Sequence, residues 1–335
     1  MNARFQWGIR RVRAALQSDA LRLSGICLGI GLLMTLLLPG KFLTVRNLTS
    51  MGFQFPELGL FALAVMLSLI TGGIDLSVVS TANLAGILAA LVLTRLIPEG
   101  AGDRATLVGL LAAVGLALAT GALCGLGNGL IITRLGVTPI LATLGTMQLY
   151  MGFSLVITRG PAVSGFPKAF LALGNGTLAG VPVPLWLFAM AGMAVALLLG
   201  RTVFGVQAGL IGSSDRAARF AGIPVTSVLV RTYVVSGVLA GLAGLIIIAH
   251  TNSAKADYGA SYLLQAVLVA ILGGVDPKGG FGRVRGVVLA LLALQFLSSG
   301  FSLLRFSQFT KEFAWGVLLL LAMGIGALGR RDGRP

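Results

Sequence analysis

Long apolar segments follow one another along almost the entire chain, and few charged residues interrupt them. Of the 335 residues, 56% are hydrophobic and only 10% are charged. A soluble domain carries about 25% charged residues, so this chain lacks the polar side chains that a water-facing surface requires. The composition excludes a soluble enzyme, a disordered chain and a secreted disulfide scaffold, and it indicates an integral membrane protein.

The apolar segments predict an all-α polytopic membrane protein. A helix needs about 20 apolar residues to cross the hydrocarbon core, and charges, prolines and glycine clusters divide the chain into about ten such segments. They define a transmembrane domain over residues 22–329, with a cytoplasmic segment 1–21 before it and a cytoplasmic tail 330–335 after it. The predicted spans are residues 22–39, 55–71, 76–95, 105–133, 136–158, 184–200, 226–249, 262–275, 286–304 and 313–329.

The positions of the basic residues predict how the spans are oriented. The formal net charge is +15. Most of the 25 Lys and Arg residues lie in the terminal segments and in every second connection between spans, all of which are on the same side of the membrane. Because basic residues concentrate on the cytoplasmic side of membrane proteins, both termini are expected in the cytoplasm. The first apolar run is expected to remain as a span, since no small-residue cleavage pattern follows it. Nucleic-acid binding is not expected, because there is no basic surface interleaved with aromatic residues.

Two short spans each end in a Gly-Gly pair followed by an aspartate. The first pattern is Gly72, Gly73 and Asp75, and the second is Gly273, Gly274 and Asp276. The match is either a coincidence or a trace of internal duplication. A Gly-Gly pair breaks a helix and frees backbone groups that hydrocarbon cannot satisfy. Short, glycine-interrupted spans mark the transport path in secondary transporters, and by analogy they indicate one here.

Each of the two aspartates has two interpretations. A carboxylate at the centre of a membrane helix costs about 2.5–3.5 kcal/mol on insertion scales, which favours a functional role. Alternatively, each aspartate lies in a cytoplasmic turn and caps the next helix. Asp276 precedes Pro277 and Lys278, which favours the turn. Asp75 lies between two apolar runs without a basic neighbour, and both interpretations of it stay open.

Most polar residues inside the predicted spans are neutral. Such groups suit the hydroxyls of a polyhydroxylated solute, and they equally tie helices together. Further neutral polar residues within spans are Ser154, Ser236, Gln265 and Gln295. The candidate translocation path consists of Gly72, Gly73, Asp75, Ser77, Asn83, Asn128, Thr143, Thr146, Gln148, Gly273 and Gly274.

Other isolated features are interpreted as packing. Small residues recur every four positions at Ala117, Gly121, Gly125 and Gly129, and a second stripe includes Gly237, Gly241 and Gly244. Such stripes let two membrane helices approach closely. Cys27 and Cys124 are expected to be small packing residues, and His250, the only histidine, a hydrogen-bonded residue at a span end.

The largest cytoplasmic loop, about residues 201–225, contains one short helix. Ser213 or Ser214 can cap its start, and Asp215 suits the positive end of the helix dipole. Gly222 can adopt the left-handed conformation after its last turn, and Pro224 prevents continuation. So short a helix needs a surface to dock on, because helix nucleation is costly in water. That surface is the bilayer, a partner protein or the protein's own helix bundle.

Several classes of chemistry lack their residues. There is no Gly-x-x-x-x-Gly-Lys-Ser/Thr loop for phosphate, no metal-ligand cluster and no Ser/His/Asp arrangement. A proton-coupled carrier usually keeps a chain of intramembrane acidic residues or histidines, and only Asp75 is a serious candidate here. The chain is therefore not expected to be an enzyme, to bind a cofactor or metal, or to energise transport by itself.

Several motifs resemble the permease subunits of ribose-type sugar ABC importers. The similar stretches are Ile70–Ser77, Asn128-Gly129 with Val137–Met147, Ile211–Ile223, and Ile271–Gly274 with Gly279–Gly282, in the order in which the family has them. The resemblance runs from about residue 20 to residue 330, so that it extends over nearly the whole chain. The Asp276-Pro277-Lys278 turn and Val78-Val79 depart from many relatives. Ser253–Ser261 looks more like the rhamnose and autoinducer-2 branches than the ribose branch, which leaves the sugar open.

The resemblance implies a ten-span permease in the bacterial inner membrane. It implies as partners cytoplasmic ABC ATPase subunits that use ATP and magnesium, a periplasmic sugar-binding protein, and a second permease copy or homologue. In this family the cytoplasmic loop helix docks into the ATPase. Here that role falls on Ile211, Gly212, Ser213, Ser214, Asp215, Arg216, Ala217, Ala218, Arg219, Phe220, Gly222 and Ile223. The alternative function is a self-sufficient facilitator or channel for small polar solutes.

Overall fold

The computed structural model describes residues 21–97 and 102–331, and these residues are almost entirely helical. The expected cytoplasmic segments at the two ends, residues 1–21 and 330–335, fall almost wholly outside this range. The helices are Leu21–Leu37, α2 (Val45–Ile70), α3 (Val78–Leu96), α4 (Asp103–Arg134), α5 (Pro139–Thr158), α6 (Lys168–Asn175), α7 (Val183–Arg201), α8 (Val203–Ser213), α9 (Asp215–Phe220), α10 (Val225–Thr251), α11 (Ala260–Leu272), α12 (Val284–Leu303) and α13 (Gln308–Arg331).

The helix lengths and compositions are those of a polytopic membrane protein. Within the described residues, seven helices are long and apolar enough to cross a membrane, namely α2, α3, α4, α5, α7, α10 and α12. Three shorter apolar helices are Leu21–Leu37, α8 and α11. Each of the predicted spans coincides with a helix, and the all-α architecture is confirmed.

Two local predictions were wrong. The second span does not begin at residue 55, because α2 starts at Val45 and continues through Pro56. Membrane helices tolerate an internal proline where their surroundings satisfy the freed carbonyl. In addition, the loop at about residues 201–225 contains two helices, α8 and α9, where one short helix was expected. The segment before α7, for which no prediction was made, contains α6. α6 and α8 are short amphipathic or apolar helices whose stability depends on packing rather than on span length.

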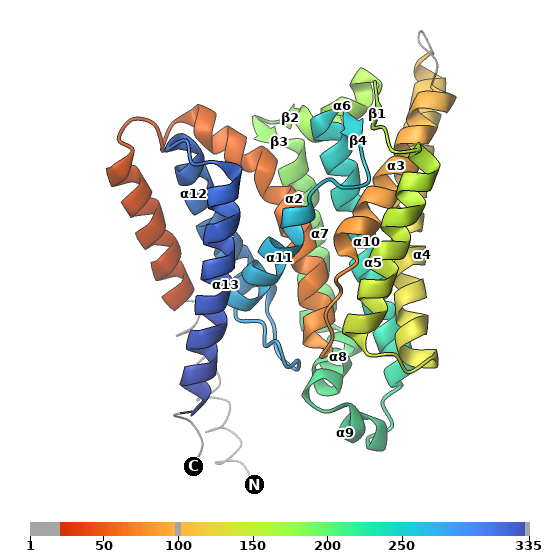
Figure 1. The fold of residues 1–335 in the computed structure, drawn as a ribbon, viewed down its shortest axis with the longest axis vertical. Helices are drawn as coiled ribbons and strands as arrows, with labels where there is room; N and C mark the ends of the chain where they lie inside the picture. Colours follow the sequence, from red (N-terminus) through yellow and green to blue (C-terminus); the bar gives the residue numbers. More distant parts are fainter. Residues whose placement is uncertain (1–20, 98–101, 332–335) are drawn as a thin grey trace.

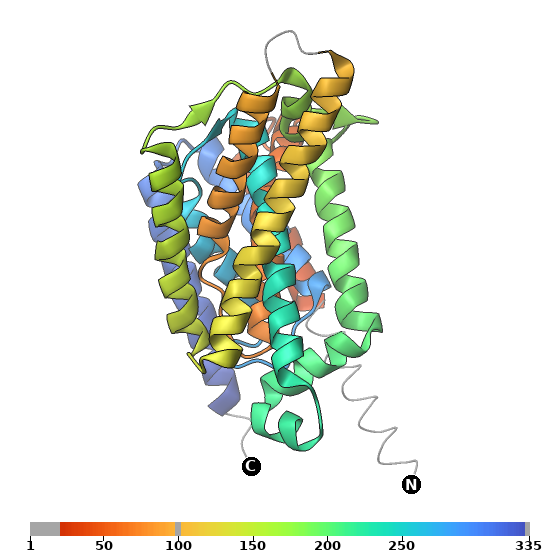
Figure 2. The same cartoon turned by 90° about the vertical axis from the view of Figure 1, so that its right-hand side faces the viewer.

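The two ends of the molecule differ in structure. α8 and α9 lie at one end, where α13 also terminates (Figure 1). At the opposite end lie α6 and two small antiparallel sheets. β1 (Val163–Ser164) pairs with β4 (Ser253–Ala254), and β2 (Thr177–Leu178) pairs with β3 (Val181–Pro182). A turned view shows α3, α4, α5 and α10 running side by side between these ends (Figure 2).

The hydrophobic core is built around α2. Phe61, Leu63 and Met66 are fully buried on it. They belong to a cluster that also includes Ile247 of α10, Leu268 of α11 and Leu291 of α12. A helix that is apolar on all sides is surrounded either by protein or by lipid, and 89% of the most apolar part of α2 is buried inside the protein. α2 therefore lies inside the bundle, in contact with most of the other spans.

The small-residue stripes pack against each other, and they provide the close helix approach that such residues were expected to permit. A Cβ atom at Gly121 would overlap the carbonyl oxygen of Gly237, and one at Gly237 would overlap that of Gly121. A Cβ atom at Gly125 would overlap the carbonyl oxygen of Tyr233. The backbones of α4 and α10 are thus in direct contact, which only glycine permits at these positions.

Gly125→Ala is expected to destabilise the protein, because the added methyl group would force α4 away from α10. Overpacking of this kind costs about 1–3 kcal/mol. The matched control is Gly115→Ala on the same helix, since nothing lies within 4 Å of a Cβ atom there. The temperature at which the detergent-solubilised protein loses its monodisperse size-exclusion peak should fall for the first variant alone. Equal temperatures would contradict the close contact.

Candidate functional site

A buried carboxylate lies at the break between α2 and α3. Asp75 is 1% exposed. One carboxylate oxygen accepts hydrogen bonds from the Ser77 hydroxyl at 2.7 Å and the Ser77 N–H at 3.1 Å. The other accepts from the Ser236 hydroxyl of α10 at 2.8 Å. Asp75 is therefore enclosed by donors from two parts of the chain, and it does not lie in an exposed turn.

Further polar residues extend this network to α4 and α5. The Asn128 amide donates to the Ser77 hydroxyl at 2.8 Å, and the Thr143 hydroxyl lies 3.0 Å from the carbonyl oxygen of Ile74. Hence the Asp75 network, comprising Asp75, Ser77, Asn128 and Ser236, joins the helix break to α4 and α10, and Thr143 joins it to α5. Two buried atoms at this network, Asn128 Oδ1 and Tyr233 Oη, have no hydrogen-bond partner among the described residues.

The other predicted path residues lie elsewhere. The Asn83 amide donates to the carbonyl oxygens of Ala256 and Tyr258, both at 2.9 Å, and so anchors the segment before α11. The Thr146 hydroxyl donates to the Thr143 carbonyl on its own helix, and Gln148 is exposed on α5. Gly273 packs against the backbone of Gly286 at the start of α12.

The two Gly-Gly pairs are not equivalent in structure. α2 ends at Ile70 with Gly72 in the left-handed region, whereas α11 ends at Leu272 with Gly274 in that region. The first Gly-Gly pair thus begins two residues after its helix ends, whereas the second pair begins one residue after. Asp276 accepts a hydrogen bond from the Lys278 N–H at 2.9 Å, so that it lies in a turn, as the second interpretation of this residue has it.

The predicted short helix is present in the segment after α8. The Ser214 hydroxyl accepts from the Ala217 N–H at 3.2 Å, and Gly222 has a φ of 76°. Asp215 and Arg219 form an ion pair at 3.0 Å along one exposed face. Ala218 is buried, whereas the ring of Phe220 is 82% exposed. α9 therefore rests one face on the protein and presents the other outward.

Glycines connect this segment to the end of α2. A Cβ atom at Gly212 would overlap both the Ile70 carbonyl oxygen and the Gly280 nitrogen. The Gly280 N–H donates to that same carbonyl at 2.9 Å. We call the four glycines that meet here, Gly72, Gly212, Gly279 and Gly280, the glycine junction. It brings α2, α8 and the α11–α12 connection into backbone contact.

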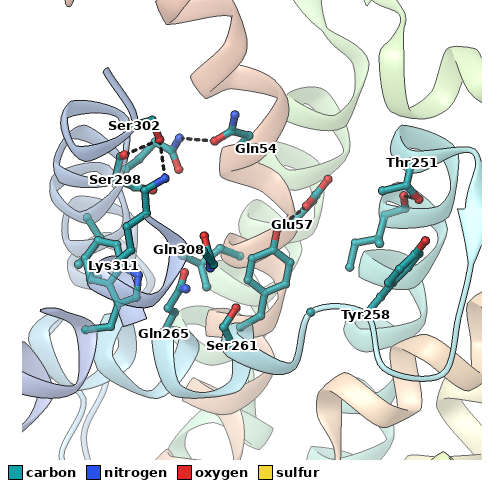
Figure 3. Close-up of a pocket in the computed structure, with 17 residues that line it drawn as sticks. Gln54, Glu57, Thr251, Tyr258, Ser261, Gln265, Ser298, Ser302, Gln308 and Lys311 are labelled. Carbon is teal, nitrogen blue, oxygen red and sulfur yellow. Dashed lines mark hydrogen bonds between the residues drawn. The ribbon is translucent and has the colours of Figure 1, made fainter. Parts of the chain in front are cut away.

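A separate cavity of about 470 Å³ lies between α2, α10, α11, α12 and α13. Glu57 of α2 is its buried carboxylate (Figure 3). The His250 Nδ1 atom lies 2.7 Å from one Glu57 oxygen, and the Tyr262 hydroxyl donates to the other at 2.8 Å. We call this the Glu57 cavity. Of the described residues that line it, none belongs to the predicted path.

The sequence reasoning missed Glu57. His250 is hydrogen-bonded near a span end, as expected, but its partner is an acidic residue within an apolar run. Gln265 and Gln295, two of the neutral polar residues noted within spans, also line the cavity. The signal that the sequence contains is a charged residue within the second predicted span, one helical turn after Gln54. Among the described residues, no group of three or more His, Cys, Asp and Glu side chains could hold a metal ion.

The fold and these sites define a membrane transport subunit, and the comparisons with known proteins agree. Residues 47–323 match the family described as branched-chain amino acid transport system / permease component, and the chain belongs to this family. It is a multi-pass protein of the inner membrane.

The relatives include the "Autoinducer 2 import system permease protein LsrD" of Yersinia pseudotuberculosis (serotype O:3, strain YPIII) and of Yersinia pestis (strain Pestoides F). Each is 32% identical over 291 residues, which cover 85% of this chain and 84% of the relative.

Asp75→Ala is expected to destabilise the protein, because it leaves the Ser77 and Ser236 hydroxyls and one N–H without their acceptor. A hydrogen bond to a charged group contributes about 1.5–3 kcal/mol, so the thermal midpoint in detergent should fall clearly. Asp75→Asn keeps one acceptor oxygen and should lose less. Asp103→Ala, at the exposed start of α4, is the control. An Asp75→Ala protein as stable as this control would refute the structural role.

Proposed function

We propose that the chain is the membrane-spanning permease subunit of an ATP-driven importer, and that it moves a sugar or sugar-like polyol across the inner membrane. A separate ABC ATPase subunit would bind ATP and magnesium and hydrolyse the nucleotide. The observation that carries the proposal is α9, a short capped helix that presents an aromatic ring outward and is joined through α8 to the broken end of α2.

The exposed face of α9 fits a protein partner. The guanidinium carbon of Arg216 lies 5.9 Å from the centroid of the Phe220 ring, and both side chains belong to the outward face. Aromatic residues and arginine dominate the binding energy of protein interfaces. An ATPase subunit docked here would press on α8, and Gly212 would pass that displacement to α2.

A second cavity supports the same coupling route. It has a volume of about 290 Å³ and lies between the α4–α5 turn, the end of α2 and the α8–α9 segment. Thr71, Gly73 and Pro139 line it together with Ile211, Asp215 and Arg219. The α8–α9 segment therefore has open space beside it. It can shift relative to the break between α2 and α3 without first displacing packed side chains.

The solute class is proposed from two observations. The relatives named above are autoinducer 2 import permeases, and motifs of this chain resemble the permease subunits of ribose-type sugar importers. In this chain the polar side chains within spans are mostly neutral, which suits hydroxyl groups. As its resemblance to sugar ABC importer permeases implies, the chain would work with a periplasmic binding protein and with a second permease copy or homologue, and the solute would cross by alternating access.

Reconstitution separates this function from a self-sufficient facilitator. The permease complex and its ATPase are placed in liposomes with the binding protein, and sugar uptake and ATP hydrolysis are measured together. Uptake should require ATP, and the solute-loaded binding protein should stimulate hydrolysis. Uptake of the same solute by the isolated chain without ATP would favour the facilitator instead.

Phe220→Asp is expected to uncouple the importer, because it places a charge in the centre of the proposed docking face. An aromatic anchor contributes about 2 kcal/mol or more, so ATPase binding should weaken more than tenfold. Phe309→Asp is the matched control, since Phe309 is also 82% exposed but begins α13 at the other end of the molecule. Recovery of the ATPase with the affinity-purified permease is the measurement. Equal recovery for both variants and the unmodified protein would exclude α9 as the docking site.

A further inference from the structure

Polar side chains from five helices and one loop converge on the Glu57 cavity. Glu57 and Gln54 come from α2, Gln265 from α11 and Gln295 from α12 (Figure 3). The Lys311 ammonium of α13 donates to the Ser302 hydroxyl at 2.8 Å on the same wall. Further polar residues of the lining are Thr251, Tyr258, Ser261, Ser298 and Gln308. So many polar groups around one space inside an apolar bundle indicate a site for a polar molecule.

Glu57 is held in a fixed orientation. Each carboxylate oxygen has one partner, His250 on one side and Tyr262 on the other. An ionised carboxylate offers about four lone-pair sites, so each oxygen can accept a further hydrogen bond from a molecule in the cavity. Burial of a polar group is costly unless it is hydrogen-bonded, and the His250 and Tyr262 contacts offset that cost.

The rest of the lining suits hydroxyl groups. The amides of Gln54, Gln265 and Gln295 can each donate and accept, so that they can satisfy hydroxyls in either sense. Trp315 is 3% exposed and, with Tyr262, contributes an aromatic surface against which the apolar face of a sugar ring can pack. A volume of about 470 Å³ lies within the usual range for small-molecule sites.

The loop beside the cavity is fixed by a residue of another helix. Asn83 of α3 donates to the backbone on both sides of Asp257, which places Tyr258 at the cavity wall. Asn83 is therefore a positioning residue for this wall.

We propose that the Glu57 cavity is the binding site of the permease for an uncharged, polyhydroxylated solute of monosaccharide size, and that Glu57 accepts hydrogen bonds from its hydroxyls. The inference rests on the proposed function and names the site at which that function is exercised.

The test compares Glu57→Gln with Glu312→Gln in the reconstituted, ATPase-bound complex. Glu312 lies on α13 near the cavity but does not line it, and the chemical change is the same. Uptake is measured for ribose, rhamnose and autoinducer 2, for monodeoxy analogues of whichever is transported, and for leucine. Glu57→Gln should raise the half-saturating concentration about tenfold and leave the maximal rate within about twofold.

The deoxy analogues separate recognition from a structural effect. A site built to hydrogen-bond a hydroxyl discriminates strongly against an analogue that lacks it. At least one monodeoxy analogue should therefore be transported less well than the parent sugar, and Glu57→Gln should reduce this difference. A merely structural change would weaken uptake of parent and analogue alike. If Glu57→Gln fails to assemble, Gln265→Leu carries the same test with the Glu57 contacts intact.

The outcomes distinguish the two proposals. If Glu57→Gln and Gln265→Leu both leave the half-saturating concentration and the discrimination between parent sugar and deoxy analogue unchanged, the site is overturned. The importer function would stay in place. Uptake of leucine but of none of the polyols by the unmodified complex would overturn both the polyol site and the proposed solute class. Tenfold weaker uptake in Glu312→Gln as well would show that the effect is not specific to the cavity, and would also overturn the site.

Discussion

A helix that stops inside a membrane protein exposes backbone groups that hydrocarbon cannot satisfy, and the rest of this structure depends on how α2 meets that constraint. The Gly72 and Gly73 N–H groups return to the carbonyls of Leu69 and Ser68, and the Ile70 carbonyl accepts from Gly280. The last of these bonds comes from a segment more than two hundred positions later in the chain. α2 can therefore end where it does only because the α11–α12 connection and α8 are packed against it.

The same helix extends to the Glu57 cavity. From Ile70 back to Glu57, α2 continues for thirteen residues, which at about 1.5 Å per residue is about 20 Å. Phe61, Leu63 and Met66 are fully buried along this stretch, so the helix is held on all sides. Densely packed helices shift as units rather than deform continuously. A displacement at the glycine junction would thus reach Glu57 through one element, without a separate relay of side chains.

Local signals in the sequence predicted α9 well, because its cap, its first-turn acid and its terminating glycine all act within a few residues of one another. The spans were predicted because apolar length is a property of each segment alone. The start of α2 was not predicted, since tolerance of Pro56 depends on neighbouring helices. The position of Asp75 stayed open for a related reason. Its decisive partner, Ser236, is 161 positions away, and no local pattern shows that the two side chains meet.

The two buried carboxylates differ in what their partners leave available. The Asp75 oxygens receive hydrogen bonds from Ser77 and Ser236, and Asp75 lines neither of the two cavities described above. Glu57 is similarly buried, but its two partners hold it at the wall of a cavity. Sequence position beside a Gly-Gly pair favoured Asp75, whereas access to a solute requires open volume next to the carboxylate. Asp75 therefore suits the joining of helices, and Glu57 suits contact with a transported molecule.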